Sequence, residues 1–172
     1  MKKGMILIDP KKCLTCRTCE LQCAIAHSKS KDLVKAICEE PLPQVRLKVE
    51  GVDDLGIPLQ CRHCEDAPCI KICPTKATAR LDAESPVLIK KELCIGCKWC
   101  VLVCPFGVIR AGRGGAAVTK CDLCFERLNK DELPACVAAC PSKALQFESI
   151  EDINKQKKKD FLVQFKKSKE AA

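Results

Sequence analysis

Four short runs of cysteine divide this chain, and they restrict what it can fold into more than any other feature does. With the numbers of intervening residues, the runs are Cys13-x2-Cys16-x2-Cys19-x3-Cys23, Cys61-x2-Cys64-x4-Cys69-x3-Cys73, Cys94-x2-Cys97-x2-Cys100-x3-Cys104 and Cys121-x2-Cys124-x11-Cys136-x3-Cys140. A proline follows the last cysteine of each run except the first. Cysteines on adjacent turns of one short segment make poor disulfide partners, because a disulfide requires a narrow range of separations and directions. The repeated spacing therefore indicates metal ligation.

The composition supports this interpretation. The chain has 172 residues and 17 cysteines but no tyrosine, one tryptophan and five phenylalanines, which is little aromatic mass for a conventional core. Bound metal can replace that mass, because the free energy of ligation contributes directly to folding. The apolar stretch at residues 5–8 is too short for a secretory signal, and no arginine pair precedes an apolar stretch. We therefore expect a reducing, cytoplasmic location, where thiols do not form disulfides.

The formal net charge of +8 treats every cysteine as neutral. Four oxidised [4Fe–4S] clusters, each with a core of about 2+ and four thiolates, would each add about −2 and bring the total to about zero. The basic balance therefore requires no nucleic-acid partner, and no platform of aromatic and basic residues favours one. No apolar run reaches the roughly 20 residues that span a bilayer, so we expect contact with a membrane only indirectly, through a partner protein.

The spacing within the runs is typical of cubane iron–sulfur sites. Three cysteines at x2 spacing wrap one [4Fe–4S] cluster from a single loop, and the fourth ligates the neighbouring cluster in two-cluster ferredoxins. Structural zinc sites instead use two Cys-x2-Cys pairs separated by a longer loop. Only the fourth run, with its gap of 11 residues, resembles a zinc site, yet it ends in the same Cys-x3-Cys-Pro as the second and third runs. The sequence therefore predicts four [4Fe–4S] clusters, and a structural zinc interaction module is the alternative.

Between the runs, the pattern predicts an α+β fold of short elements. Val45, Leu47 and Val49 alternate with charged residues, which is typical of a half-buried strand, and turn residues follow over 51–58. The other expected elements are strands at 5–8, 87–90, 116–120 and 145–148, helices at 20–29, 69–73, 100–104 and 136–140, and a hairpin tip at 112–115. Residues 149–172 are expected to form a helical extension that begins with a capping-box variant, and that is either solvated or a docking helix for a partner.

These motifs resemble those of the four-cluster polyferredoxin subunits of anaerobic redox complexes. The matching segments are Cys61-Arg-His-Cys-Glu-Asp-Ala-Pro-Cys69, Cys94-Ile-Gly-Cys-Lys-Trp-Cys100, Cys104-Pro-Phe-Gly-Val-Ile109, Lys120-Cys-Asp-Leu-Cys124 and Pro134-Ala-Cys-Val-Ala-Ala-Cys-Pro141. The resemblance covers residues 5 to 148 and implies two ferredoxin-like units. The outer unit would comprise residues 1–60 and 106–148 with the first and fourth runs, and the inserted unit residues 61–105 with the second and third; residues 149–172 form the extension.

The same resemblance implies that each run gives its last cysteine to the cluster of a partner run. The first cluster would bind Cys13, Cys16, Cys19 and Cys140, and the second Cys23, Cys121, Cys124 and Cys136. The third would bind Cys61, Cys64, Cys69 and Cys104, and the fourth Cys73, Cys94, Cys97 and Cys100. Some relatives replace one ligand of the third run, often with tryptophan. Here Trp99 stands beside Cys100 and replaces no ligand, so all four clusters are expected to be of the four-iron type.

The expected partners also rest on resemblance. The segment from Cys13 to Leu33 looks most like the small ferredoxin of nickel carbon monoxide dehydrogenase systems, which implies electron transfer from carbon monoxide dehydrogenase to a hydrogenase or a flavin-dependent NAD(P) reductase. The alternative resemblance is to the ferredoxins of formate dehydrogenase–hydrogenase complexes. The sequence has no glycine-rich phosphate loop and no nucleophile motif. We therefore expect a non-catalytic electron-transfer subunit of an oxidoreductase complex.

Several single residues have two interpretations on sequence alone. Cys38 has no ligand spacing around it and is expected to be a free or packed thiol. His63, inside the second run, is either a packed ring or a hydrogen-bond donor to a cluster sulfur, while His27 is expected to be structural. Trp99 is expected to pack over a cluster. Lysines beside the runs are expected to be solvated, with a role in tuning potentials or steering partners as the alternative: Lys11, Lys12, Lys90, Lys91 and Lys120.

Overall fold

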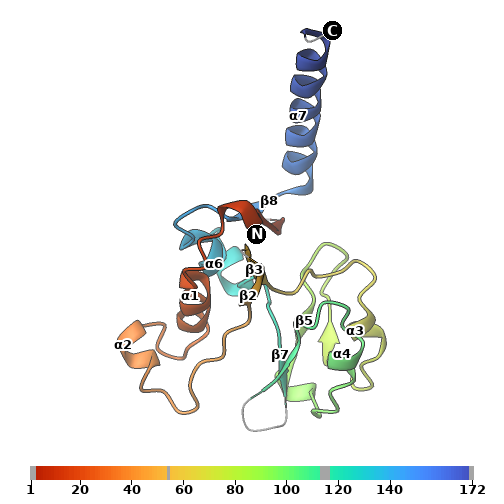
Figure 1. Ribbon diagram of the computed structural model, residues 1–172. Helices are drawn as coiled ribbons and strands as arrows, with labels where there is room; N and C mark the ends of the chain where they lie inside the picture. Colours follow the sequence, from red (N-terminus) through yellow and green to blue (C-terminus); the bar gives the residue numbers. More distant parts are fainter. Residues whose placement is uncertain (1–2, 54, 113–116, 171–172) are drawn as a thin grey trace.

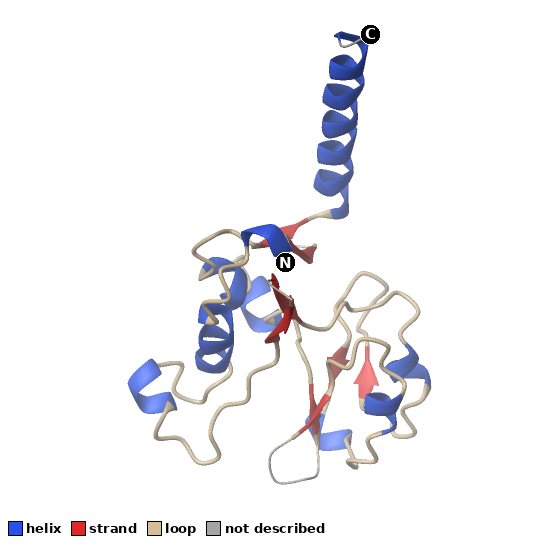
Figure 2. Cartoon of the chain, viewed as in Figure 1, coloured by secondary structure: helices blue, strands red, loops and turns tan. Residues whose placement is uncertain are grey.

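The structure, a computed structural model, describes residues 3–53, 55–112 and 117–170 (Figure 1). Its strands are β1 (Met5–Ile8), β2 (Lys48–Val52), β3 (Leu55–Leu59), β4 (Thr78–Ala79), β5 (Leu88–Ile89), β6 (Arg110–Ala111), β7 (Val118–Thr119) and β8 (Leu145–Glu148). Its helices are α1 (Thr18–Ala26), α2 (Leu33–Ala36), α3 (Pro68–Lys71), α4 (Trp99–Leu102), α5 (Phe125–Leu128), α6 (Ala135–Ala138) and α7 (Ile150–Glu170), with 3₁₀ turns η1 (Pro10–Lys12) and η2 (Lys91–Leu93). Short elements joined by long loops dominate the body, as expected for a small fold of mixed helix and strand (Figure 2).

The strands of the described residues pair as two-stranded antiparallel sheets. β1 pairs with β8, with Met5 opposite Glu148 and Ile8 opposite Leu145, so the two ends of the cysteine-rich body lie together. β4 pairs with β5, and β6 pairs with β7. The strands expected at 5–8 and 145–148 have their full length, and those expected at 87–90 and 116–120 are shorter. Most of the expected hairpin tip at 112–115 lies outside the described residues.

The turn expected over residues 51–58 is shorter than predicted, because most of this range is strand. β2 and β3 form a hairpin there, with Val49 opposite Pro58. Proline is tolerated because a two-stranded sheet has only edge strands, where a missing N–H need not break the ladder. Gly56 is required by packing, since a Cβ at that position would collide with the side chain of Thr15. The hairpin therefore lies directly against the loop of the first cysteine run.

The expected short helices are present, with boundaries shifted by a few residues. The helices expected at 69–73, 100–104 and 136–140 correspond to α3, α4 and α6, and the helix expected at 20–29 corresponds to α1. Each of α3, α4 and α6 ends before the cysteine that precedes proline, because proline disfavours the helical conformation in the residue before it. The last cysteine of these three runs is thereby released from its helix.

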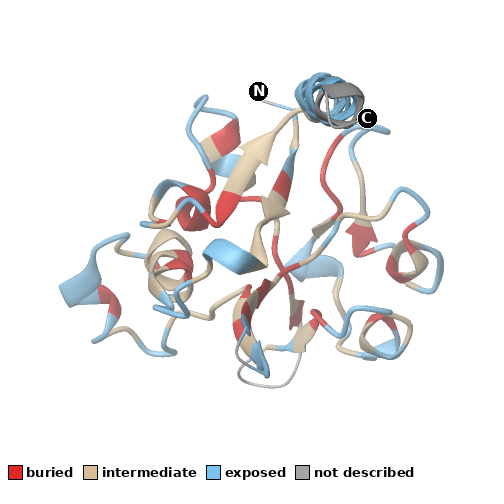
Figure 3. Ribbon diagram, turned by 45° about the horizontal axis from the view of Figure 1, so that its top comes forward, coloured by how far each residue is buried: buried red, intermediate tan, exposed pale blue. Residues whose placement is uncertain are grey.

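Two hydrophobic cores hold the body together, and cysteines belong to both. Figure 3 shows that the buried segments lie in the body of the protein. The first consists of Ile6, Cys19, Cys23, Leu47, Val49, Leu123, Leu128, Cys136, Val137, Cys140, Ala144 and Leu145. The second consists of Ala67, Cys69, Val87, Cys100, Ile109 and Val118. Ile109 and Val118 thus pack with residues of the expected inserted unit, although the expected boundary at residue 106 assigns them to the outer unit. The reason is that the β6–β7 hairpin packs beside β5 (Figure 1).

The expected helical extension is present as α7, which projects away from the body (Figure 1). Its first turn is capped as the sequence predicts: the Asp152 N–H donates to Ser149 Oγ (3.1 Å), and this hydroxyl donates to Asp152 Oδ2 (2.9 Å). Phe161 and Phe165 stack with ring centroids 6.2 Å apart, and both are exposed. The helix contributes to neither core. Within the described residues, no helix combines the length and apolar character needed to cross a membrane.

Candidate metal centres

The four cysteine loops share one backbone feature that the sequence does not reveal. In each, the residue two positions after the first cysteine has a positive φ, a conformation that costs a non-glycine residue about 1–3 kcal/mol. These residues are Thr15 (53°), His63 (50°), Gly96 (71°) and Leu123 (57°). The turn directs backbone N–H groups inward: those of His63 and Leu123 donate to Cys61 Sγ and Cys121 Sγ, both at 3.4 Å. The same loop, with a left-handed residue at the same position, occurs four times around cysteines and forms a cradle for thiolates.

A second repeated turn follows each Cys-Pro pair. Lys76, Gly107 and Lys143 have φ values of 53°, 60° and 56°, and their N–H groups donate to the carbonyls three residues earlier, at 3.2, 3.2 and 3.4 Å. The turn therefore accepts its hydrogen bond at the carbonyl of the last cysteine of the run. The hydroxyls of Thr75 and Ser142 lie 3.8 and 3.7 Å from the sulfurs of Cys73 and Cys140. These hydroxyls were not predicted from the sequence, although both stand two residues after the last cysteine.

One cavity brings together four cysteines from two runs. Its walls include Cys73 from the second run, and Cys94, Cys97 and Cys100 from the third. This is the ligand set expected for the fourth cluster. The remaining lining residues are Thr75, Ala77, Thr78, Ile95, Lys98 and Val118.

The first and fourth runs also act on each other electrostatically. Hydrogen bonds from Thr18 lower the pKa of Cys16, and the charge of Cys140 opposes this effect. Burial raises the pKa of Cys136 strongly, and the charges of four other thiols raise it further: Cys121, Cys124, Cys23 and Cys19. Helices α1 and α6 contact each other, and one core contains Cys19 and Cys23 from the first run with Cys136 and Cys140 from the fourth.

The second and third runs show the same exchange. Burial raises the pKa of Cys69 to about 11, and the charges of Cys61, Cys100 and Cys104 add to this effect. Cys100 of the third run packs in one core with Cys69 of the second, and Cys104 packs against this core.

The exposure of the thiols is uneven. Buried cysteines are Cys19, Cys23, Cys69, Cys100, Cys121, Cys124, Cys136 and Cys140, whereas Cys13, Cys61, Cys64, Cys73, Cys94 and Cys104 are partly buried. Cys16 and Cys97 are exposed, so the two sites that contain them are open at one edge. Cys38 is a free, exposed thiol, as expected, and Trp99 is half-exposed at the start of α4.

Asp122 connects the first and fourth runs, a role that was not predicted from the sequence. Its carboxylate accepts from His27 Nε2 (3.0 Å) and from the Cys124 N–H (3.0 Å), and forms an ion pair with Arg46. Burial works to lower the pKa of His27, but hydrogen bonds with Asp122 and Cys23 raise it to about 9, so the ring is protonated at neutral pH. Burial works to raise the pKa of Asp122, but His27 and Arg46 hold it well below its usual range. The backbone N–H of Arg46 donates to Cys23 Sγ (3.3 Å), so this network links the first and fourth cysteine loops.

Asp122→Asn keeps the size of this side chain but removes the charge that His27 and Arg46 share. Breaking a fully buried pair costs about 3–5 kcal/mol, and we expect about 2 kcal/mol here because these groups are partly exposed and screened. Guanidinium unfolding of the anaerobic protein, followed by cluster absorbance, measures the loss. Glu126→Gln is the matched control, because its ion pair with Lys31 (2.8 Å) is exposed and worth about 0.5 kcal/mol or less. Equal losses in the two variants would contradict the role of Asp122.

His63 is a packed ring with one unused donor. The Val87 N–H donates to its Nδ1 (3.0 Å), so the ring proton is assigned to Nε2, which is buried and has no partner among the described residues. Burial lowers the pKa of His63 to about 3, with the charge of Lys120 adding to this effect, so the ring is neutral. This supports the packed-ring interpretation and leaves one N–H without an acceptor in the described part of the chain.

The donors fit iron–sulfur clusters on three independent grounds. Four thiols from two runs line one cavity, as a cubane requires. Backbone N–H groups point at ligand sulfurs, which is how proteins stabilise such anionic sites. Lys120 is a buried cation, and within the described residues no carboxylate forms an ion pair with it, so the site calls for another anion. The expectation that Lys120 is solvated is wrong. The other lysines beside the runs are exposed, as expected.

The repeated thiol cradles and the two cysteine-rich cores define a ferredoxin-type protein with several iron–sulfur clusters. Residues 52–150 match the model of the 4Fe-4S dicluster domain family. The chain belongs to this family, and it binds multiple [4Fe–4S] clusters.

Named relatives agree with this assignment. The protein is similar to an iron–sulfur protein of Rhodospirillum rubrum, with 42% identity over 86% of its own length and 83% of that relative. It is 39% identical to the electron transport protein HydN of Escherichia coli K12, over 81% of its own length and 85% of HydN. It is 31% identical to the B subunit of the anaerobic dimethyl sulfoxide reductase of the same strain, over 87% of its own length and 75% of that subunit. The protein is therefore an iron–sulfur electron-transfer protein.

Proposed function

We propose that this chain relays electrons through four [4Fe–4S] clusters and transforms no substrate itself. The first and second clusters have the ligand sets Cys13, Cys16, Cys19, Cys140 and Cys23, Cys121, Cys124, Cys136. The third and fourth have Cys61, Cys64, Cys69, Cys104 and Cys73, Cys94, Cys97, Cys100. When bound, the clusters supply one-electron redox chemistry, and the protein sets their potentials through burial, charge and hydrogen bonds to sulfur. The observation that carries this proposal is the fourfold repetition of the same left-handed turn inside the cysteine loops.

We also propose that the body divides into two units, and strand pairing and core packing support this division. β1 pairs with β8, and the core that contains Cys19 and Cys23 also contains Cys136 and Cys140, which supports an outer unit built from the two ends of the body. The second core supports an inserted unit that starts at residue 61. Because Val118 belongs to this core, we place its end after β7 rather than at residue 105.

As partners, we propose carbon monoxide dehydrogenase as the donor and a hydrogenase or a flavin-dependent NAD(P) reductase as the acceptor, in the cytoplasm. The support is the resemblance of the segment from Cys13 to Leu33 described above. The alternative is an electron-transfer subunit of another oxidoreductase, such as a formate dehydrogenase–hydrogenase complex. The similarity to one subunit of the dimethyl sulfoxide reductase favours a subunit role but names no partner for this protein.

Two measurements test the proposal. Anaerobically purified protein should contain about 16 iron and 16 sulfide per chain, and fewer than about eight iron would contradict four clusters. Zinc in place of iron would support the structural interaction module instead. Isolation of the intact complex then identifies the partner, because nickel in it supports carbon monoxide dehydrogenase, whereas molybdenum or tungsten supports formate dehydrogenase.

A further inference from the structure

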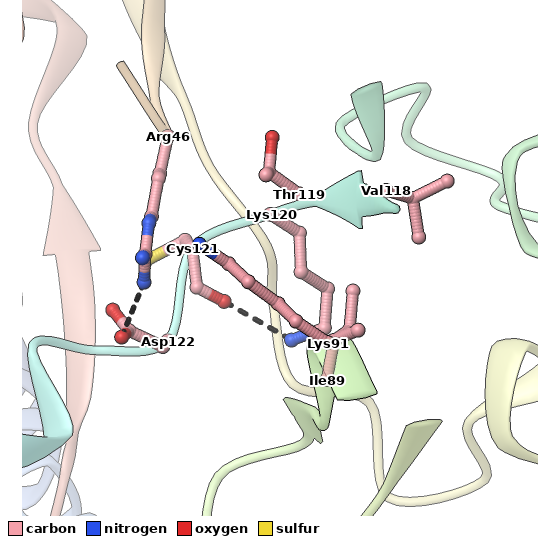
Figure 4. A pocket seen from close by; sticks show the side chains of 8 residues that line it. All are labelled: Arg46, Ile89, Lys91, Val118, Thr119, Lys120, Cys121 and Asp122. Carbon is pink, nitrogen blue, oxygen red and sulfur yellow. Dashed lines mark hydrogen bonds and ion pairs between the residues drawn. The ribbon is translucent and has the colours of Figure 1, made fainter. Parts of the chain in front are cut away.

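Lys120 is a buried ammonium group at the junction of the two cores. It follows β7 and precedes Cys121, and only 4% of its surface is exposed. Its Nζ donates to the carbonyl of Cys121 (3.0 Å; Figure 4) and to the carbonyl of Val87. Val87 belongs to the second core, and Cys121 begins the fourth cysteine run, so one side chain ties the two units together.

The partners of Lys120 do not compensate its charge. Two neutral carbonyls accept two of its three N–H donors, and within the described residues no carboxylate pairs with it. The carboxylate that lines the same pocket, Asp122, pairs with Arg46 instead (Figure 4). A buried charge is costly unless an opposite charge is near. The site therefore calls for an anion that the side chains do not provide.

Predicted cluster ligands lie on both sides of this charge. On one side, Lys120 is bonded along the chain to Cys121, a predicted ligand of the second cluster. On the other side, the Nζ of Lys120 donates to the carbonyl of Val87, and Val87 packs in the same core as Cys69. Cys69 is a predicted ligand of the third cluster. The ammonium group thus lies beside residues of both the second and the third cluster sites, and we call these two the inner sites.

We propose that Lys120 is a shared counter-cation for the second and third clusters, and that it raises the reduction potential of both. Each reduction adds one electron to a site that is already anionic. A fixed cation nearby therefore stabilises the reduced form more than the oxidised form. Placed beside both inner sites, Lys120 makes each easier to reduce. This inference rests on the proposed function, because it requires the clusters to be present.

The test compares reduction potentials of anaerobic variants by EPR-monitored titration. Lys120→Gln keeps a donor for the carbonyls but removes the charge, and we expect two of the four one-electron waves to move to lower potential. The equilibrium constant for reduction of those two should fall at least tenfold, which is about 59 mV for a one-electron couple. Lys120→Arg keeps the charge, and Lys91→Gln removes an exposed charge from the same pocket (Figure 4). Both should stay within about twofold of the wild type, because water screens the charge of Lys91.

Each outcome is decisive. Full iron content with unchanged waves in Lys120→Gln, or an equal shift of all four waves, would overturn the proposal. If Lys120→Gln assembles too little iron for a titration, full assembly in Lys120→Arg supports the counter-cation and failure of both variants overturns it. Cys136→Ala should abolish one of the two shifting waves, and loss of a wave that does not shift would contradict the inner location. Wild-type protein without clusters would contradict the proposed function rather than the role of Lys120.

Discussion

Replacing Cys140 with alanine is expected to damage the cluster of the first run and to spare the cluster of its own run. In the proposed ligand sets, Cys140 completes the site of Cys13, Cys16 and Cys19, and its charge acts on Cys16 in the structure. The variant should lose about four of roughly 16 iron atoms, because one cubane carries four irons. The Cys140 sulfur is buried, but truncation to alanine leaves only a small void, so we expect the body to stay folded.

The controls for Cys140→Ala use the other thiols. Cys16→Ala should remove the same EPR signal, and Cys136→Ala a different one, because Cys136 is assigned to the second cluster. Cys38→Ala should keep all the iron, since this exposed thiol belongs to no run. A Cys140→Ala spectrum that matches Cys136→Ala instead of Cys16→Ala would refute the exchange of ligands between runs.

Removing the clusters is expected to unfold the body of the protein. Cys19, Cys23, Cys136 and Cys140 belong to the first core, and Cys69 and Cys100 to the second, so the metal sites and the cores are built from the same side chains. Structural zinc sites supply about 10–16 kcal/mol of binding free energy, and iron–sulfur sites of similar weight would exceed the about 5–15 kcal/mol by which a whole domain is usually stable. Apo-protein should therefore lose its native packing.

Hydrogen exchange after anaerobic chelation measures this effect. The amides of β1 and β8, which pair across the first core, should lose protection in the apo-protein and regain it when iron and sulfide are restored. The exposed helix α7 is the internal control, because it contributes to neither core and its exchange should change little. Slow exchange of β1 and β8 in fully apo-protein would show that the apolar residues suffice without metal.

Local patterns in the sequence anticipate much of this structure. The strands at 5–8 and 145–148, the capping of α7 by Ser149 and Asp152, and the short helices that stop ahead of proline all follow from neighbouring residues. The hairpin at β2 and β3 was missed because Gly56 and Pro58 are typical of turns. In the structure, Gly56 is selected by its close approach to Thr15, a residue far away along the chain.

Cysteine spacing by itself determined the kind of chemistry, because the three thiols of a loop are only a few residues apart and their geometry is local. Tertiary structure decided the rest. Cys140 meets the first loop, and Cys73 meets the third, only because helices distant in sequence pack together. Burial, likewise, is a property of the packed chain: Lys120 and Lys91 both stand beside cysteine runs, yet only Lys120 lies between the two cores and loses contact with water. A charge has a long reach only where water is excluded, so the same residue type has different consequences at the two positions.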